Sequence, residues 1–168
     1  TNAMLRTTTA LTIVNAGNKE NVLPGRADAT VNFRILPGDT QGQVLEHVKS
    51  ELAQAVGEGK VKVTALPGAQ EASKVAPTAS NQYHLLNKTI REVFPGTLVA
   101  PGLMVAATDS VHYSELSDHI FKFSPVRANA EDLKRFHGTN ERLSTSNYAE
   151  AIRFYHRLLS EGAKAPAP

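Results

Sequence analysis

The sequence predicts an α/β protein of the α+β kind, with a partial ferredoxin-like layer followed by part of a second strand-and-helix layer. Residues 7–66 carry two strand patterns, a capped helix pattern and a further strand pattern, in that order. Residues 66–80 are rich in Pro, Gly and small polar residues, as is typical of a linker. Beyond this linker, helix patterns alternate with short apolar runs.

The chain begins with two predicted strands. Residues 7–14 form a β-branched run, and the turn residues of 15–18 follow it. Residues 27–35 alternate between apolar and polar side chains, as in a half-buried strand that carries Arg34 on its polar face. The apolar face of that strand would consist of Ala27, Ala29, Val31, Phe33 and Ile35.

A helix is predicted after the second strand. Thr40 and Gln43 have the spacing of a capping box, and Gly57 and Gly59 end the helical pattern. The apolar stripe of this helix would contain Val44, Val48, Leu52 and Val56. Residues 61–66 then alternate as another strand. A complete ferredoxin-like layer would need one more strand and helix at its front.

The second half alternates helix and strand patterns. Ser80 is expected to cap a helix that carries Leu86, Ile90 and Val93 and ends at Pro95-Gly96. Residues 109–116 are expected to be helical. Short apolar strands are expected at 98–100, 103–107 and 120–123. These strands are too few to close a parallel sheet covered on both faces, so the chain resembles a piece of something larger.

His137 lies between two predicted helices. Asn129 would cap a short helix before it, and Ser144 a longer one after it. The longer helix would carry an apolar stripe of Tyr148, Ile152, Tyr155 and Leu159. A neutral imidazole beside Gly138, on a turn, suits a metal ion. The alternative is a surface histidine stabilised by its neighbours, because a lone His carries no metal spacing.

Two other places could bind a ligand. The hydroxyls of Thr108 and Ser110 at a predicted helix start could bind an anion or a carbonyl oxygen. Asp109 could equally be an ordinary N-cap. Arg34, on the open face of its strand, could clamp a carboxylate or be a solvated edge charge.

Composition excludes several classes of protein. With 18 basic and 16 acidic residues the net charge is +2, and no basic stripe favours nucleic acid. No apolar run is long enough to span a bilayer, and no signal-like start is visible. The absence of cysteine excludes disulfides, thiolate metal sites and thiol nucleophiles, and leaves the compartment open. Residues 1–3, ahead of Met4, look like a cloning remnant.

Five short stretches occur in a fixed order along the chain. They are Thr7–Ala10, Lys19–Pro24, Val31–Thr40, Thr108–Ser110 and His137–Glu141. Together they resemble the C-terminal part of a two-zinc metallopeptidase of the carboxypeptidase S branch. That family also includes aminoacylase, glutamate carboxypeptidase and succinyl-diaminopimelate desuccinylase. Each motif is modest, but their ordered occurrence from Met4 to about Glu161 is specific.

The resemblance implies a division of the chain. Residues 4–75 would be a partial lid (dimerisation) domain. Residues 76–163 would be the C-terminal segment of a zinc-peptidase α/β catalytic domain, and 164–168 a tail.

It also implies roles for single residues. His137 would be the last of the family's five zinc ligands. From the lid, Asn21 would grip the substrate's carbonyl and Arg34 its carboxylate, often across a dimer. Thr108, followed by Asp109 and Ser110, would line the substrate pocket.

The implied activity is metal-assisted hydrolysis of an amide next to a free carboxylate, with two zinc ions in full-length members. The substrate would be a small peptide or an N-acyl amino acid, and the enzyme a homodimer. The family's His-x-Asp and Glu-Glu motifs are missing here, so we expect this chain alone to be inactive. Ala106-Ala107 and Val111 also stand where the family usually has Gly-Gly and its carboxypeptidase S branch has Arg.

Two alternatives remain open. One is a non-catalytic dimerisation or interaction module, which would associate through the unpaired edge of an incomplete sheet. The other is an unrelated helix-and-sheet binding domain, which would require the order of the motifs to be accidental.

Overall fold

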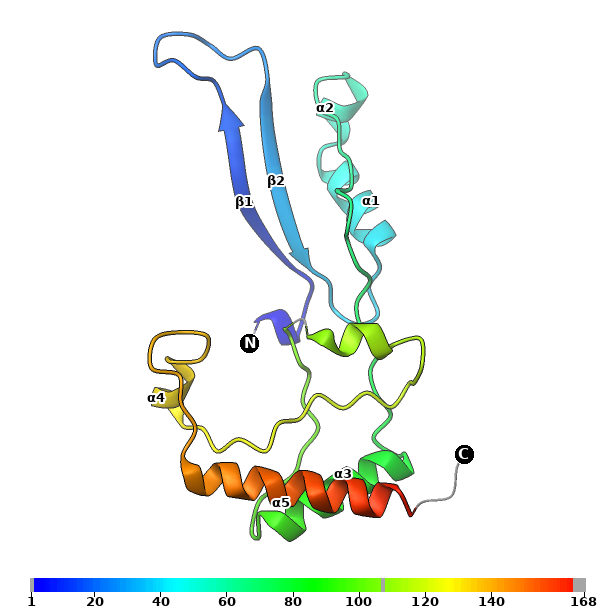
Figure 1. Ribbon diagram of the computed structural model, residues 1–168. Helices are drawn as coiled ribbons and strands as arrows, with labels where there is room; N and C mark the ends of the chain where they lie inside the picture. Colours follow the sequence, from blue (N-terminus) through cyan, green and yellow to red (C-terminus); the bar gives the residue numbers. More distant parts are fainter. Residues whose placement is uncertain (1, 107, 165–168) are drawn as a thin grey trace. The chain divides into compact units, whose positions relative to one another are not determined.

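The computed structural model describes residues 2–106 and 108–164 (Figure 1). The chain is α+β, as predicted, and divides into two compact units. The first comprises Thr1–Val75 with Val105–Val111, and the second Ala76–Met104 with His112–Pro168. Thr1 of the predicted remnant, Ala107 and the predicted tail beyond Lys164 lie outside the described residues. No helix within the described ranges is long and apolar enough to cross a membrane.

The first unit contains an antiparallel pair of strands, β1 (Thr8–Ala16) and β2 (Ala27–Arg34), which confirms both predicted strands. The register runs from Thr8 opposite Arg34 to Ala16 opposite Ala27, with a bulge between Leu11 and Ile13. The expected burial of one face is wrong, because Ala27, Ala29 and Val31 are exposed. Only Phe33 and Ile35 of that face are partly buried.

The predicted capping box is present at the start of α1 (Gln41–Glu51). The Thr40 hydroxyl accepts a hydrogen bond from the Gln43 N–H, and the Gln43 side chain accepts one from the Thr40 N–H at 2.8 Å. The helix is interrupted at Leu52, where φ is −101° and ψ is 14°. A separate short helix, α2 (Ala53–Gly57), follows, so the single predicted helix is in fact two.

The strands expected at 61–66, 98–100 and 120–123 are absent. Residues 103–106 are also irregular, and Ala107 of that predicted strand lies outside the described part. In the described ranges β1 and β2 form the only sheet. Alternating apolar side chains become a strand only when a neighbouring edge offers a ladder of hydrogen bonds. Neither β1 nor β2 pairs with any of these segments, so the segments remain irregular despite their strand-like sequence.

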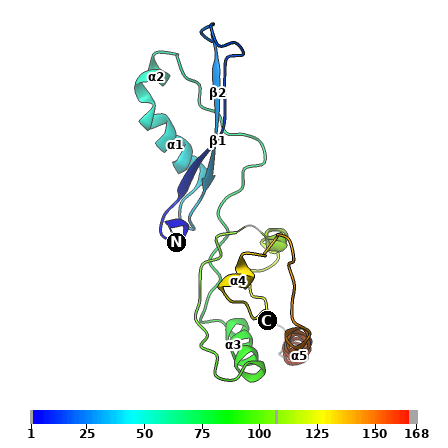
Figure 2. The same cartoon turned by 90° about the vertical axis from the view of Figure 1, so that its left-hand side faces the viewer.

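The second unit is built on two helices that pack side by side, α3 (Asn81–Val93) and α5 (Thr145–Gly162) (Figure 2). Both begin at the predicted serine caps, Ser80 and Ser144. Leu86, Val93 and Leu158 lie against the core. The core itself consists of Ile90, Phe94 and Phe154.

Phe154 occupies the centre of this core and is only 1% exposed. Its ring centroid lies 6.4 Å from that of Phe94 and 5.2 Å from that of Phe123. Phe123 belongs to a segment that forms no hydrogen bonds to a neighbouring strand. Packing between aromatic rings therefore holds this segment in place of strand pairing.

A buried amide ties an irregular segment to α5. Asn147 is 2% exposed, and its side chain accepts a hydrogen bond from the Arg127 N–H at 2.8 Å and donates one to the Pro125 carbonyl at 3.0 Å. The Arg127 guanidinium pairs with Glu150 at 2.7 Å and lies 5.0 Å from the Phe94 ring centroid. The hydrogen bond from Arg127 lowers the pKa of the Glu150 carboxyl.

The apolar stripe that marks α5 in the sequence is not its buried face. Tyr148, Ile152, Tyr155 and Leu159 are 62%, 56%, 46% and 70% exposed. The chain as a whole exposes 13,404 Å². Two separately folded proteins of half its 18.1 kDa mass would together expose about 9,700 Å². Much apolar surface on the chain is therefore uncovered.

We predict that Phe154→Ala lowers the free energy of unfolding of the second unit by about 3 kcal/mol, because it leaves a cavity beside the rings of Phe94, Phe123 and Tyr155. Tyr148→Ala, at a 62% exposed position on the same helix, is the matched control and should cost less than about 1 kcal/mol. Urea titrations followed by far-UV circular dichroism measure both. Equal losses for the two variants would contradict this account of the core.

Candidate functional site

The turn that carries His137 begins at a capped helix, α4 (Ala130–Leu133). The Asn129 side chain accepts hydrogen bonds from the Glu131 and Asp132 N–H groups, which confirms the predicted cap. The Asp132 carboxylate accepts one from the Asn129 N–H in return. This bond, together with the nearby charge of Arg135, lowers the pKa of Asp132.

The chain then follows a series of tight turns up to Gly138. The N–H of Arg135 donates to the Asp132 carbonyl at 3.0 Å, and the N–H of Phe136 to the Leu133 carbonyl at 3.3 Å. The N–H of Gly138 donates to the Arg135 carbonyl at 2.9 Å. The Arg135 guanidinium also forms an ion pair with Asp132 across the same turn. The backbone on both sides of His137 is therefore held by local bonds.

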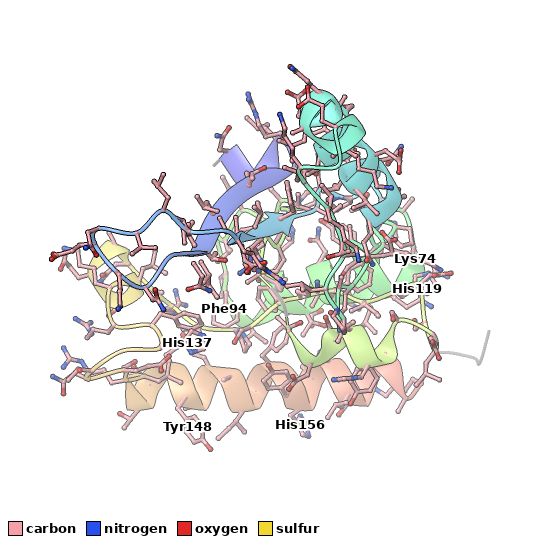
Figure 3. All side chains as sticks on the ribbon, turned by 90° about the horizontal axis from the view of Figure 1, so that it is seen from above. Lys74, Phe94, His119, His137, Tyr148 and His156 are labelled. Atoms are coloured by element: carbon pink, nitrogen blue, oxygen red, sulfur yellow. The ribbon has the colours of Figure 1, made fainter. Side chains whose placement is uncertain are left out.

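His137 lies on this turn with a φ of 58°, in the left-handed region. Its imidazole is exposed and meets the Phe136 ring edge-on, with 4.3 Å between centroids and 67° between planes. Figure 3 labels His137 among the side chains of this part of the chain. A non-glycine residue in this backbone region costs free energy, and such residues cluster at functional sites. The observed conformation therefore motivates a functional hypothesis for His137.

Both ends of the segment that carries His137 are anchored on the first turns of α5. Asn147 binds the backbone at Pro125 and Arg127, and Ser144 caps the helix where the segment returns. A segment closed on one helix loses much of its conformational freedom. The packing of α5 thus also restrains the position of His137.

The described residues hold no group of three or more His, Cys, Asp or Glu side chains that could bind a metal. A catalytic zinc ion needs about three protein ligands. His137 offers one suitable nitrogen, so this part of the chain does not carry a complete zinc site. Any complete site would have to draw its other ligands from elsewhere.

The Thr108–Ser110 motif lies in the first unit and His137 in the second. The two hydroxyls of the motif are 2.6 Å apart, and the Ser110 N–H donates to the Thr108 hydroxyl at 3.3 Å. In place of the helix predicted for 109–116 there is a shorter 3-10 helix, η2 (Asp109–Tyr113). Thr108, rather than Asp109, satisfies a backbone donor at its start.

Asn21 and Arg34 belong to opposite ends of the β1–β2 pair. Arg34 is the last residue of β2, opposite Thr8, whereas Asn21 lies in the loop beyond the pair of Ala16 and Ala27. At ~3.3 Å per residue, the ladder between these ends is about 23 Å long. Both side chains are exposed, and the ladder does not bring them together.

Sequence reasoning missed Asn147 and Phe136, which hold the segment and contact the imidazole. The signal for Asn147 was a polar residue on the side of α5 away from its apolar stripe. The signal for Phe136 was an aromatic residue directly before a histidine on a turn.

Comparison with known families and structures gives one match. Residues 1–60 match the family model described as the peptidase dimerisation domain, of the M20 type. No solved structure matches the chain significantly.

Curated relatives match nearly all of the chain. It is 42% identical, over 96% of its length, to probable carboxypeptidase S-like 2 of Dictyostelium discoideum. It is 41% identical, over 100% of its length, to the N-fatty-acyl-amino acid synthase/hydrolase PM20D1 of Xenopus tropicalis, and over 95% to that of Homo sapiens. The matched part spans 30%, 32% and 31% of these three proteins. Residues 1–60 are therefore similar to the M20 peptidase dimerisation domain, and the chain as a whole is similar to about a third of proteins named carboxypeptidase S-like and PM20D1.

We predict that the backbone at residue 137 discriminates between side chains. His137→Val should destabilise the second unit by about 1–2 kcal/mol more than His137→Asn, because a β-branched residue fits the left-handed region poorly and Asn tolerates it. Both variants remove the imidazole, so each is the other's control. Chemical denaturation of the two proteins measures the difference, and equal stabilities would contradict a left-handed residue 137.

Proposed function

We propose that this chain forms part of a zinc-dependent carboxypeptidase or N-acyl-amino-acid amidohydrolase that cleaves an amide next to a free carboxylate. The observation that carries the proposal is homology along nearly the whole chain to proteins named for such reactions. Residues 4–75 would serve as the lid, and 76–163 as the end of the catalytic domain. Because the chain spans about a third of those relatives, we infer that it is inactive alone.

In this proposal His137 supplies one zinc ligand, and further ligands come from the rest of the enzyme. Bound zinc would supply an activated water molecule and polarise the scissile carbonyl. The conformation of His137, exposed at the tip of an anchored segment, supports this role because the imidazole is accessible to a second part of the protein.

The remaining residues would bind and orient the substrate. Arg34 would hold the free carboxylate through its planar pair of N–H donors, and Asn21 would donate to the carbonyl. Thr108 and Ser110 would line the pocket. Their hydroxyls lie within 2.6 Å of each other, so one of them can donate outward to a ligand while accepting from the other.

The register of the strands supports a site shared between two protomers. One hairpin cannot present both Asn21 and Arg34 to one small substrate, because about 23 Å of ladder separates its two ends. Two hairpins related by a two-fold axis could bring the loop of one protomer to the strand end of its partner.

We predict that Asn21→Ala and Arg34→Ala each abolish most amidohydrolase activity in a longer protein that carries this segment with the rest of its catalytic domain. Mixing the two inactive variants, after dissociation and reassociation, should restore about a quarter of wild-type activity, because one site in each mixed dimer is intact. Mixing two pools of Asn21→Ala is the control. No recovery would refute the shared site, whereas an inactive wild-type protein would refute the proposed reaction.

A second candidate function is a dimerisation module without catalysis, and the exposed sheet favours it. Leu11, Ile13 and Val14 on β1 are 63%, 53% and 58% exposed, and the described residues form no ladder on either outer edge of the pair. Such a surface recruits another chain. The two functions are compatible, because an inactive segment of an enzyme can still associate.

We predict that the chain is a dimer in solution through its first unit. Ile13→Lys should weaken association by about 10-fold or more, because it places a charge on an apolar contact. Leu98→Lys, at a position 92% exposed in the second unit, is the matched control. Light scattering over a concentration series measures both variants. A strict monomer at high concentration would contradict this candidate.

A further inference from the structure

We propose that Phe136 is a positioning residue that fixes the orientation of the His137 imidazole before any metal binds. This inference rests on the proposed role of His137 as a zinc ligand. The observation behind it is the edge-on contact of the two rings, with 4.3 Å between their centroids.

Phe136 has no comparable role in the core of the second unit. Its side chain is 65% exposed although it is large and apolar, and it is absent from the cluster around Phe154. Within the part of the chain that the structure describes, the Phe136 ring makes its one aromatic contact with His137. The position of this ring therefore matters to the imidazole more than to the fold.

The imidazole needs an orienting contact of this kind. A metal-binding histidine is usually held by a hydrogen bond from its second ring nitrogen to a carboxylate or a carbonyl. Among residues 2–106 and 108–164, no such bond to His137 is present. An edge-to-face aromatic pair favours one arrangement about 2- to 13-fold. The phenyl ring thus restricts the imidazole without occupying either ring nitrogen.

The backbone makes the contact possible. Three turn bonds and the Arg135–Asp132 ion pair hold residues 132–138, and His137 has a left-handed φ of 58° where its ring meets that of Phe136. Adjacent rings also meet edge-on within α5, where 5.3 Å separates the centroids of Phe154 and Tyr155, but the Phe136–His137 pair is closer, at 4.3 Å, and lies on an exposed turn. The turn bonds hold the backbone of both residues where their rings meet.

The test is nuclear magnetic resonance on the metal-free 168-residue chain. It uses Phe136→Leu, which keeps the apolar bulk but removes the ring, and Phe136→Tyr, which restores the ring. Tyr148→Leu, at an exposed aromatic elsewhere in the same unit, is the matched control. The readouts are Overhauser contacts between the two rings, the ring-current shift of the imidazole protons, and the χ1 couplings of His137.

In the wild type, Phe136→Tyr and Tyr148→Leu we expect ring contacts, shifted imidazole protons and one dominant χ1 rotamer. In Phe136→Leu we expect the couplings to average and the rotamer preference to fall by about 2- to 13-fold, with an unchanged unfolding midpoint. A dominant rotamer that survives in Phe136→Leu would overturn the proposal, as would averaged couplings in the wild type. Adding zinc afterwards tests the ligand role separately, because orientation is measured without metal.

Discussion

The buried amide of Asn147 is the interaction on which the organisation of the second unit depends. It satisfies a backbone carbonyl at Pro125 and a backbone N–H at Arg127, both in a segment that has no ladder of its own. Leaving the buried Pro125 carbonyl unpaired would cost about 1–3 kcal/mol, so the amide holds this segment on α5. The segment from Arg127 to Ser144 therefore leaves and returns to the same helix. His137 lies at the far part of that closed segment, which explains how an exposed residue is restrained.

The same unit shows how little of the chain's apolar surface is used internally. The core consists of three buried apolar side chains and covers one face of α5. The stripe of Tyr148, Ile152, Tyr155 and Leu159 remains exposed. In the first unit the apolar side chains of Leu11 and Ile13 on β1 are likewise exposed to solvent. Both units thus retain surfaces of the kind that proteins normally cover. Homology to proteins about three times as long is consistent with this pattern.

The candidate site has the same incomplete character. His137 offers a single nitrogen, Arg34 and Asn21 lie at the two ends of one hairpin, and Thr108 and Ser110 form a local hydroxyl pair. Each position is chemically suited to its proposed role, and none of these groups forms a working centre within one unit. Under the proposed function, a working site would therefore draw on a second protomer and on a further part of the enzyme.

Local patterns in the sequence determined the features that depend on neighbouring residues. The caps at Thr40, Ser80, Asn129 and Ser144 and the turn at His137 were predictable, because capping and turn bonds span three or four residues. The extended conformation of β1 and β2 was predictable from their alternating and β-branched residues, but their pairing was not. Only the tertiary structure decided which patterns found a partner. Residues 61–66 and 120–123 carry strand-like alternation without an adjacent edge, and α5 buries Phe154 and Asn147 rather than its longer apolar stripe. The physical reason is that pairing and burial depend on the surfaces present in space, and an isolated pattern contains no information about them.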